Sequence, residues 1–161
     1  MKKRFARPIL IFLIALLAAL TACIPEGVVR AGSLVPASGL LAQPGAQPLR
    51  IVFNGVATGR GSFQVTLPGG EVIQGNYETM GGFSADATAE TQAPGQTVIT
   101  GADWQALYGN ANAMAGQIGG QGTGRGDKGT LLRMQYVVDA FDNRGYGVAK
   151  DSRGNMYELK F

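Results

Sequence analysis

The chain has one strongly nucleophilic side chain, the thiol of Cys23, and no histidine among its 161 residues. A thiolate is a nucleophile and a metal ligand, whereas histidine is the commonest general base and neutral metal ligand. A single cysteine cannot form a disulfide within the chain. Reactive chemistry is therefore expected at Cys23 alone, and no catalytic residue, metal site or cofactor site is predicted elsewhere.

The 22 residues before Cys23 have the order of an export signal. Four basic residues lie within the first seven positions, and residues 9–20 contain no polar side chain. This apolar run has twelve residues, whereas a helix needs about 20 to cross a bilayer core. Residues 1–22 are therefore predicted to be a cleaved signal peptide and not a permanent transmembrane span.

The sequence Leu20-Thr21-Ala22-Cys23 resembles the lipobox of bacterial lipoproteins. The resemblance implies that a signal peptidase recognises the first three residues and cleaves before Cys23, whose sulfur carries a diacylglyceryl group and whose amino group receives a fatty acid such as palmitate. Several acyl chains attach a protein durably to membrane lipid. Because Ile24 follows and not aspartate, the family pattern implies the outer membrane of the cell envelope. The alternative is an ordinary signal peptide that contains a cysteine.

The basic charge of the chain belongs to its first segment. Four of the 14 Lys and Arg residues precede Cys23 and none of the 11 Asp and Glu residues does, so the chain from Cys23 onward has a net charge of −1. Nucleic acid and anionic lipid are recognised by basic clusters. Arg125 and Lys128 are close in sequence, but Asp127 lies between them. No basic cluster is predicted, and nucleic-acid binding is disfavoured.

Residues 23–48 are predicted to be the lipidated N-terminus and a flexible tether, because prolines interrupt residues 24–48 at positions 25, 36, 44 and 48 and no strand or helix period survives. A random coil of this length would span about 25 to 30 Å. The alternative is that residues 32–42 pack on the domain as a strand or short helix. The folded domain is predicted over residues 49–161.

Alternation of apolar and polar residues predicts a mainly β domain. Leu49 to Phe53 is one expected strand, and two alternating runs around Pro68-Gly69-Gly70 form a hairpin. The last third predicts a three-stranded meander, with strands at Thr130–Asp139, Tyr146–Lys150 and Met156–Phe161. We therefore expect a small antiparallel β-barrel or sandwich of six to eight strands.

The middle of the domain is ambiguous. Thr97 to Ile99 could form a strand, and Asp103 could cap a short helix that Gly109 ends. Glycine is frequent from Gly109 to Gly129, with a spacing that membrane helices use to pair. Charged and amide side chains interrupt that spacing here, so strand edges and loops are favoured.

Three carboxylates suggest carboxylate catalysis, calcium binding or local turn structure. Asp139, Asp142 and Asp151 supply oxygen ligands, but they lie near turn glycines or asparagines, where acidic residues commonly bond to the nearby backbone. The turn interpretation is favoured, as it is for the adhesion-like tripeptide Arg125-Gly126-Asp127. Five aromatic residues could form a platform for a ligand or could belong to the core, and the core role is favoured. They are Tyr77, Trp104, Tyr136, Tyr146 and Tyr157.

The part of the chain from about residue 59 to residue 161 resembles a group of small uncharacterised proteobacterial lipoproteins. The resemblance is carried by Arg125 to Thr130, Tyr136, Gly145 to Val148, Asp151, Gly154, Tyr157, Leu159 and Phe161. Many members of that group carry cysteines at the positions of Met134 and Ala149. If the turn is centred at Asp142, these two positions lie opposite each other, and a Met–Ala contact replaces a cross-strand disulfide. The group brings no known activity.

The leading functional hypothesis is a non-enzymatic envelope lipoprotein that binds an envelope protein or cell-wall component, or supports an assembly there. One alternative is a surface-exposed adhesin or exclusion factor. Another is a hydrolase, which needs convergent polar groups such as Asp103, Asp127 and Lys128 in one cleft.

Overall fold

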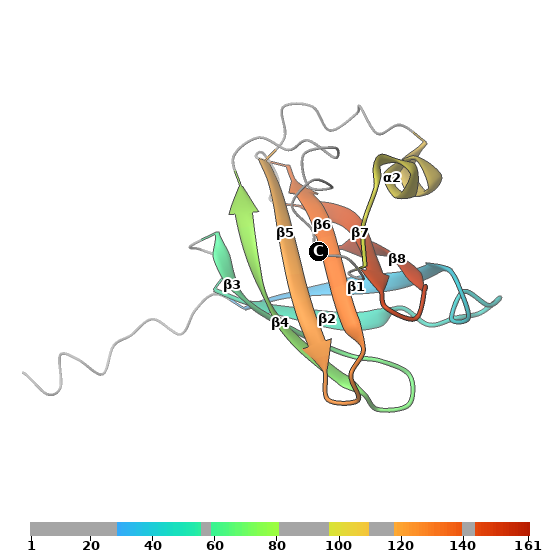
Figure 1. Cartoon of the computed structure of the whole chain (residues 1–161). Helices are drawn as coiled ribbons and strands as arrows, with labels where there is room; N and C mark the ends of the chain where they lie inside the picture. The colour runs from blue at the N-terminus through green and yellow to red at the C-terminus, as the bar shows by residue number, and fades with distance from the viewer. Residues whose placement is uncertain (1–28, 56–58, 81–96, 110–117, 140–143) are drawn as a thin grey trace, which may run out of the picture.

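The computed structural model describes residues 29–55, 59–80, 97–109, 118–139 and 144–161. Every strand pairs antiparallel with the next one along the chain, and β8 pairs with β1, so the sheet closes into a barrel (Figure 1). The predictions of a mainly β fold and of a small antiparallel barrel are confirmed. The elements are β1 (Val29–Ser38), β2 (Leu49–Asn54), β3 (Arg60–Thr66), β4 (Val72–Met80), α2 (Gly101–Tyr108), β5 (Ile118–Gly126), β6 (Leu131–Val138), β7 (Gly145–Asp151) and β8 (Met156–Lys160).

Apolar side chains fill the barrel interior because the strands alternate with a period of two. In β3, for example, Phe63 and Val65 are buried, whereas Ser62 and Gln64 are not. A barrel of eight strands is just wide enough for side chains to fill. The buried residues of this core are Leu34, Ile51, Phe53, Phe63, Val65, Leu67, Ile73, Tyr77, Leu132, Met134, Tyr136, Ala149, Tyr157 and Leu159.

Four inward-facing positions of β5 are glycines, and the space that they leave is filled by side chains from other parts of the barrel. β5 carries glycine at four alternate positions, and a Cβ atom added at any of them would lie closer than 3.0 Å to a large interior side chain. The glycines are Gly120, Gly122, Gly124 and Gly126, and the side chains next to them are those of Tyr136, Met134, Phe63 and Glu71, in that order. The sequence predicted strand edges and loops here, and the structure instead has a nine-residue strand.

The prediction of a flexible tether up to Pro48 is wrong for residues 29–48. β1 occupies residues 29–38 and seals the barrel by pairing with both β2 and β8. Its alternation was hidden because most of its residues are small, and Leu34 is its one fully buried side chain. Pro36, which argued against a strand, lies where the register with β8 shifts, a position that tolerates proline. The packed-strand alternative for this segment is therefore the correct one.

The segment before β5 differs from expectation in two details. Residues 97–100 form no strand, and the N-cap of α2 is Thr100. Asp103 instead occupies the third helical position, where its carboxylate accepts from the backbone N–H of Thr100 in a capping box. α2 ends at Gly109, as predicted. Sequence patterns identified the helix but placed its cap three residues late.

α2 covers the outer face of the β6–β8 meander, as Figure 1 shows for β7. Trp104 is completely buried there and packs with outward-facing side chains of the meander. Its indole N–H donates to the Oε1 of Gln135 over 2.9 Å. A second, smaller core therefore lies outside the barrel wall. No helix within the described ranges is long and apolar enough to cross a membrane.

The two ends of the barrel are built differently. The N-terminal end, named here for the start of β1, also contains the last residues of β2, β4, β6 and β8. The turn end contains the short connections that follow β3, β5 and β7.

We predict that Gly120→Ala lowers the free energy of unfolding by about 1–3 kcal/mol, because the added methyl group meets the rigid ring of Tyr136. The measurement is urea unfolding. Gly122→Ala is the matched control, since the side chain that it meets, Met134, is flexible and can move. If both variants are instead more stable by about 0.4–1 kcal/mol, as expected for Gly→Ala at an uncrowded site, the proposed crowding is wrong.

Candidate functional site

A buried carboxylate at the turn end ties three connections together. The side chain of Glu71 accepts hydrogen bonds from the backbone N–H of Thr130 (2.9 Å) and from its hydroxyl (2.7 Å), and it forms an ion pair with Arg153. Burial alone would raise the pKa of Glu71, but these hydrogen bonds and the charge of Arg153 outweigh burial and lower the pKa below its usual 4.5. The carboxylate is thus held in its charged form as a structural brace.

Asp151 is a second structural carboxylate in the same region. It accepts hydrogen bonds from the backbone N–H groups of Arg153 and Asn155, and from the hydroxyl of Tyr157 over 2.7 Å. Burial and the contact with Asp151 raise the pKa of Tyr157, so the phenol stays a neutral donor. Local hydrogen bonding of Asp151 is therefore confirmed. Asp142 lies outside the described residues.

The hydrolase hypothesis required three side chains that the fold keeps apart. Asp103 forms an ion pair with Lys150 over 3.0 Å beside α2. Asp127 accepts from the backbone N–H of Val72, and Lys128 donates to the carbonyl of Gly69, both at the turn end. Among the described residues, no group of three or more Asp, Glu, His or Cys side chains is placed to hold a metal ion.

The aromatic side chains suggested as a platform divide between the two cores. Tyr77, Tyr136 and Tyr157 lie inside the barrel, whereas Trp104 and Tyr146 belong to the outer cluster under α2. Burial raises the pKa of Tyr136 to about 12, and its hydroxyl bonds to that of Thr79. The core interpretation is correct for these residues, and they do not form one platform.

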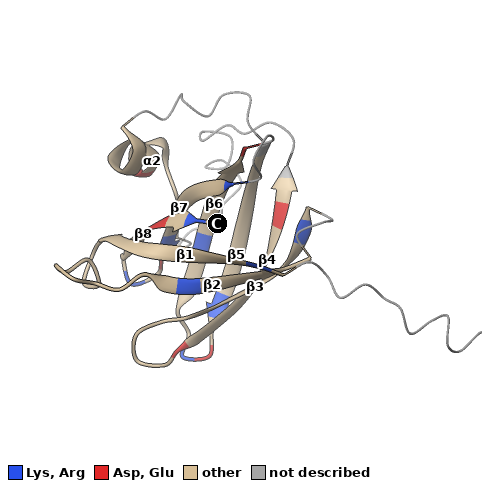
Figure 2. Ribbon diagram, turned by 180° about the vertical axis from the view of Figure 1, so that it is seen from behind, with Lys and Arg blue, Asp and Glu red and all other residues tan. Residues whose placement is uncertain are grey.

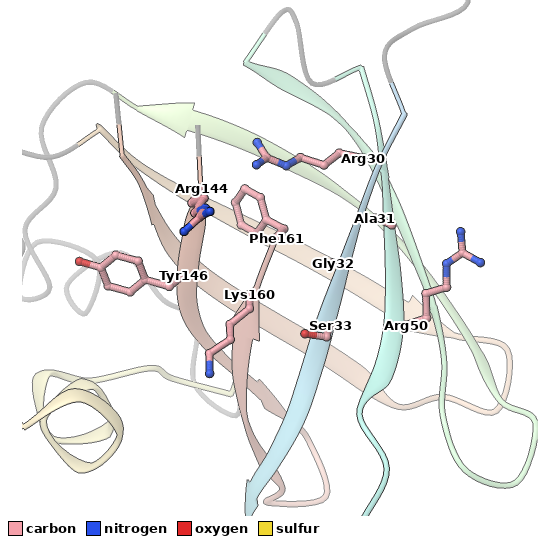
Figure 3. Close-up of a pocket in the computed structure, with 10 residues that line it drawn as sticks. Arg30, Ala31, Gly32, Ser33, Arg50, Arg144, Tyr146, Lys160 and Phe161 are labelled. Atoms are coloured by element: carbon pink, nitrogen blue, oxygen red, sulfur yellow. The ribbon is translucent and has the colours of Figure 1, made fainter. Parts of the chain in front are cut away.

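The best candidate for a binding site is a groove at the N-terminal end, where the wall of the barrel is incomplete. β1 begins at Val29 but pairs with β8 only from Ser33 onward. On the other side, Gly145 of β7 forms two backbone hydrogen bonds with Phe161, just past the end of β8. Since β8 is shorter than its neighbours, an open groove of about 860 Å³ separates residues 30–33 of β1 from the start of β7 (Figure 3).

Four basic side chains line this groove, and its ten lining residues include no acidic one. They are Arg30, Arg50, Arg144 and Lys160. The amine of Lys160 lies 2.8 Å from Glu158, which offsets part of its charge. Within the described part of the chain, Arg30 and Arg50 have no carboxylate ion-pair partner. The groove is therefore a basic surface whose cations are only partly compensated.

The floor of the groove is the ring of Phe161, which the interior supports. The guanidinium carbon of Arg30 lies 5.2 Å from the centre of this ring, within range of a cation–π interaction. The same ring lies 5.0 Å from that of Phe53 and 5.4 Å from that of Tyr136, measured between centroids. In Figure 3, Arg30 and Arg144 lie on opposite sides of Phe161. Core packing thus holds Arg30 over the groove.

Strand register brings the other cations to the same place. Arg50 pairs with Ser33, Ser33 with Lys160, and Lys160 with Tyr146, in a single row across β2, β1, β8 and β7. Adjacent strands lie about 4.8 Å apart, so the backbones of Arg50 and Lys160 are about 10 Å apart. Figure 2 shows blue segments on both sides of β1.

Sequence reasoning missed this groove. No basic cluster was predicted because only charges close together along the chain were considered. Arg30 and Lys160 are far apart in sequence and are brought near each other only by the pairing of β1 with β8. No local signal placed Arg30 in a strand, because residues 29–35 do not alternate clearly between apolar and polar side chains. Leu20, Thr21, Ala22 and Cys23, the predicted lipidation signal, lie outside the described residues.

The protein is a closed eight-stranded antiparallel barrel with a basic groove at one end. Comparisons with protein-family models, with curated proteins and with solved structures found no match to this chain.

We predict that Glu71→Gln lowers the free energy of unfolding at pH 7, because the amide replaces a charged acceptor for Thr130 and Arg153. The pKa of Glu71 is lower in the folded state, so its contribution is present above the ordinary pKa of 4.5 and is lost as the pH falls below it. Urea unfolding at pH 7 and at steps below pH 4.5 should show the wild type and the variant converging.

The matched control is Glu78→Gln, the same chemical change at an exposed carboxylate that accepts from the side chain of Gln121. It should leave the unfolding midpoint at pH 7 almost unchanged. A difference between wild type and Glu71→Gln that stays constant across the pH range would contradict the assignment of a charged brace.

Proposed function

We propose that this protein is a lipid-anchored lipoprotein of the bacterial cell envelope, with a non-enzymatic binding or structural role. The observation that carries the proposal is the sequence Leu20-Thr21-Ala22-Cys23 directly after a basic segment and a twelve-residue apolar run. Acylation of Cys23 would attach the barrel to membrane lipid, and Ile24 favours the outer membrane.

The fold supports a binding role better than a catalytic one. Its interior is occupied by packed rings, and the buried carboxylates Glu71 and Asp151 are used to hold turns. The outward side chains of β3 and β4 are uncharged hydrogen-bonding groups at several positions, including Gln64, Gln74 and Asn76. Such a surface suits contact with an envelope protein or a cell-wall component.

The adhesin or exclusion-factor alternative has less structural support. Its motif, Arg125-Gly126-Asp127, lies at the end of β5, and the Asp127 carboxylate is already bonded to the backbone N–H of Val72 over 3.2 Å. An adhesive aspartate needs its carboxylate available to the partner. Treatment of intact cells with protease separates the two possibilities, because only a surface-exposed barrel is digested.

We predict that Cys23→Ser abolishes fatty-acid labelling and leaves an uncleaved precursor, because a hydroxyl does not replace the thiolate as the acyl-accepting nucleophile. The measurement is metabolic labelling with radioactive palmitate, followed by intact-mass analysis of the purified protein. The matched control is the double variant Cys23→Ser/Ala31→Cys, which restores one thiol at an exposed position in β1. Labelling of either variant would contradict the anchor.

A further inference from the structure

We propose that the groove lined by Arg30, Arg50, Arg144 and Lys160 docks on anionic phospholipid headgroups, so that the barrel lies against the membrane with its N-terminal end toward the lipid. This inference rests on the proposed lipid anchor at Cys23. It goes further, because the anchor alone fixes only where the chain is attached and leaves the orientation of the barrel open.

The first argument is the length of the connection. Five residues separate Cys23 from Val29, where β1 begins. An extended chain spans at most about 3.6 Å per residue, so Val29 lies within about 20 Å of the acylated residue. Arg30 is the next residue, and the groove surrounds it. A connection of this length keeps the start of β1, and the groove beside it, within reach of the bilayer surface.

The second argument is charge. Phosphate-bearing headgroups give a membrane a negative surface potential, which acts on cations within a Debye length, about 8 Å at physiological ionic strength. Arg30 and Arg50 have no carboxylate ion-pair partner within the described residues. A guanidinium also matches a phosphate with two parallel hydrogen bonds. The groove therefore offers the chemistry that phosphate headgroups require.

The third argument is shape. The groove is wide and open, whereas sites for small molecules enclose most of the ligand. An open groove with an aromatic ring at its base and basic side chains along its sides fits headgroups that project from a membrane surface. The ring of Phe161 fixes Arg30, so little conformational entropy is lost when the guanidinium binds.

The experiment uses a chain that begins at Ile24 and lacks the acylated cysteine. All eight strands of the closed barrel lie within residues 29–161, so this chain contains the complete barrel. Binding is measured by sedimentation with vesicles of phosphatidylglycerol and phosphatidylcholine, and with vesicles of phosphatidylcholine alone. We expect binding to the anionic vesicles only, and we expect it to weaken as salt is added.

The double variant Arg30→Gln/Arg50→Gln should bind anionic vesicles about 25-fold more weakly, since each cation near such a surface contributes about fivefold. The matched control, Arg125→Gln/Lys128→Gln, removes two charges from β5 and its turn, across the barrel from β1, and should bind within twofold of wild type. Arg30→Lys keeps the charge and should retain binding. Urea unfolding midpoints confirm that each variant is folded.

Four results would overturn the inference: equal binding to both kinds of vesicle, equal loss in the two double variants, undiminished binding by Arg30→Gln/Arg50→Gln, or no binding at all. Inorganic phosphate at millimolar concentration should not displace the vesicles; if it does, the groove is a site for the free ion. Binding of polyglutamate that the groove variant loses, without vesicle binding, would assign the groove to an acidic protein partner. None of these results depends on acylation, which palmitate labelling tests separately.

Discussion

The pairing of β1 with β8 is the interaction on which the rest of the structure depends. Without it the sheet would be open, with two unpaired edges exposed to other chains. The pairing joins segments more than a hundred residues apart, and it is incomplete because β1 has ten residues and β8 has five. That difference in length creates the groove, so the incomplete pairing that closes the barrel also leaves a basic groove open at its N-terminal end.

Closure is possible because large and small side chains are distributed unequally around the barrel. Rings enter the interior from β2, β3, β4, β6 and β8, and Gly120 and Gly124 of β5 leave the space that the rings of Tyr136 and Phe63 occupy. At the N-terminal end the rings of Phe53 and Tyr136 both contact the ring of Phe161, and the guanidinium of Arg30 lies over that ring. Packing of the core and placement of a surface cation are therefore parts of one arrangement.

Local patterns predicted the elements whose side chains alternate clearly. The hairpin around Pro68-Gly69-Gly70 and the meander β6–β8 were recognisable, and the expected pairing of Met134 with Ala149 is present in the register. β1 and β5 were missed because they are rich in glycine and alanine, which do not reveal an alternation of apolar and polar residues. The glycines of β5 are explained instead by the large side chains that pack against them. The groove was missed for a related reason, since only closure brings Arg30 beside Lys160.

A net charge close to zero hides an asymmetry in how the charges are used. Glu71 and Asp151 are buried and accept several hydrogen bonds each, and Asp103 accepts from the backbone N–H of Thr100 in the capping box of α2. Charges separated by more than a Debye length are largely screened from each other, so carboxylates at the turn end offset little of the charge at the groove. Arg30 and Arg50, by contrast, lie at the groove, which has no acidic lining residue. The barrel is thus basic at the groove of its N-terminal end, whereas its buried carboxylates at the turn end are held by hydrogen bonds and, for Glu71, by the ion pair with Arg153.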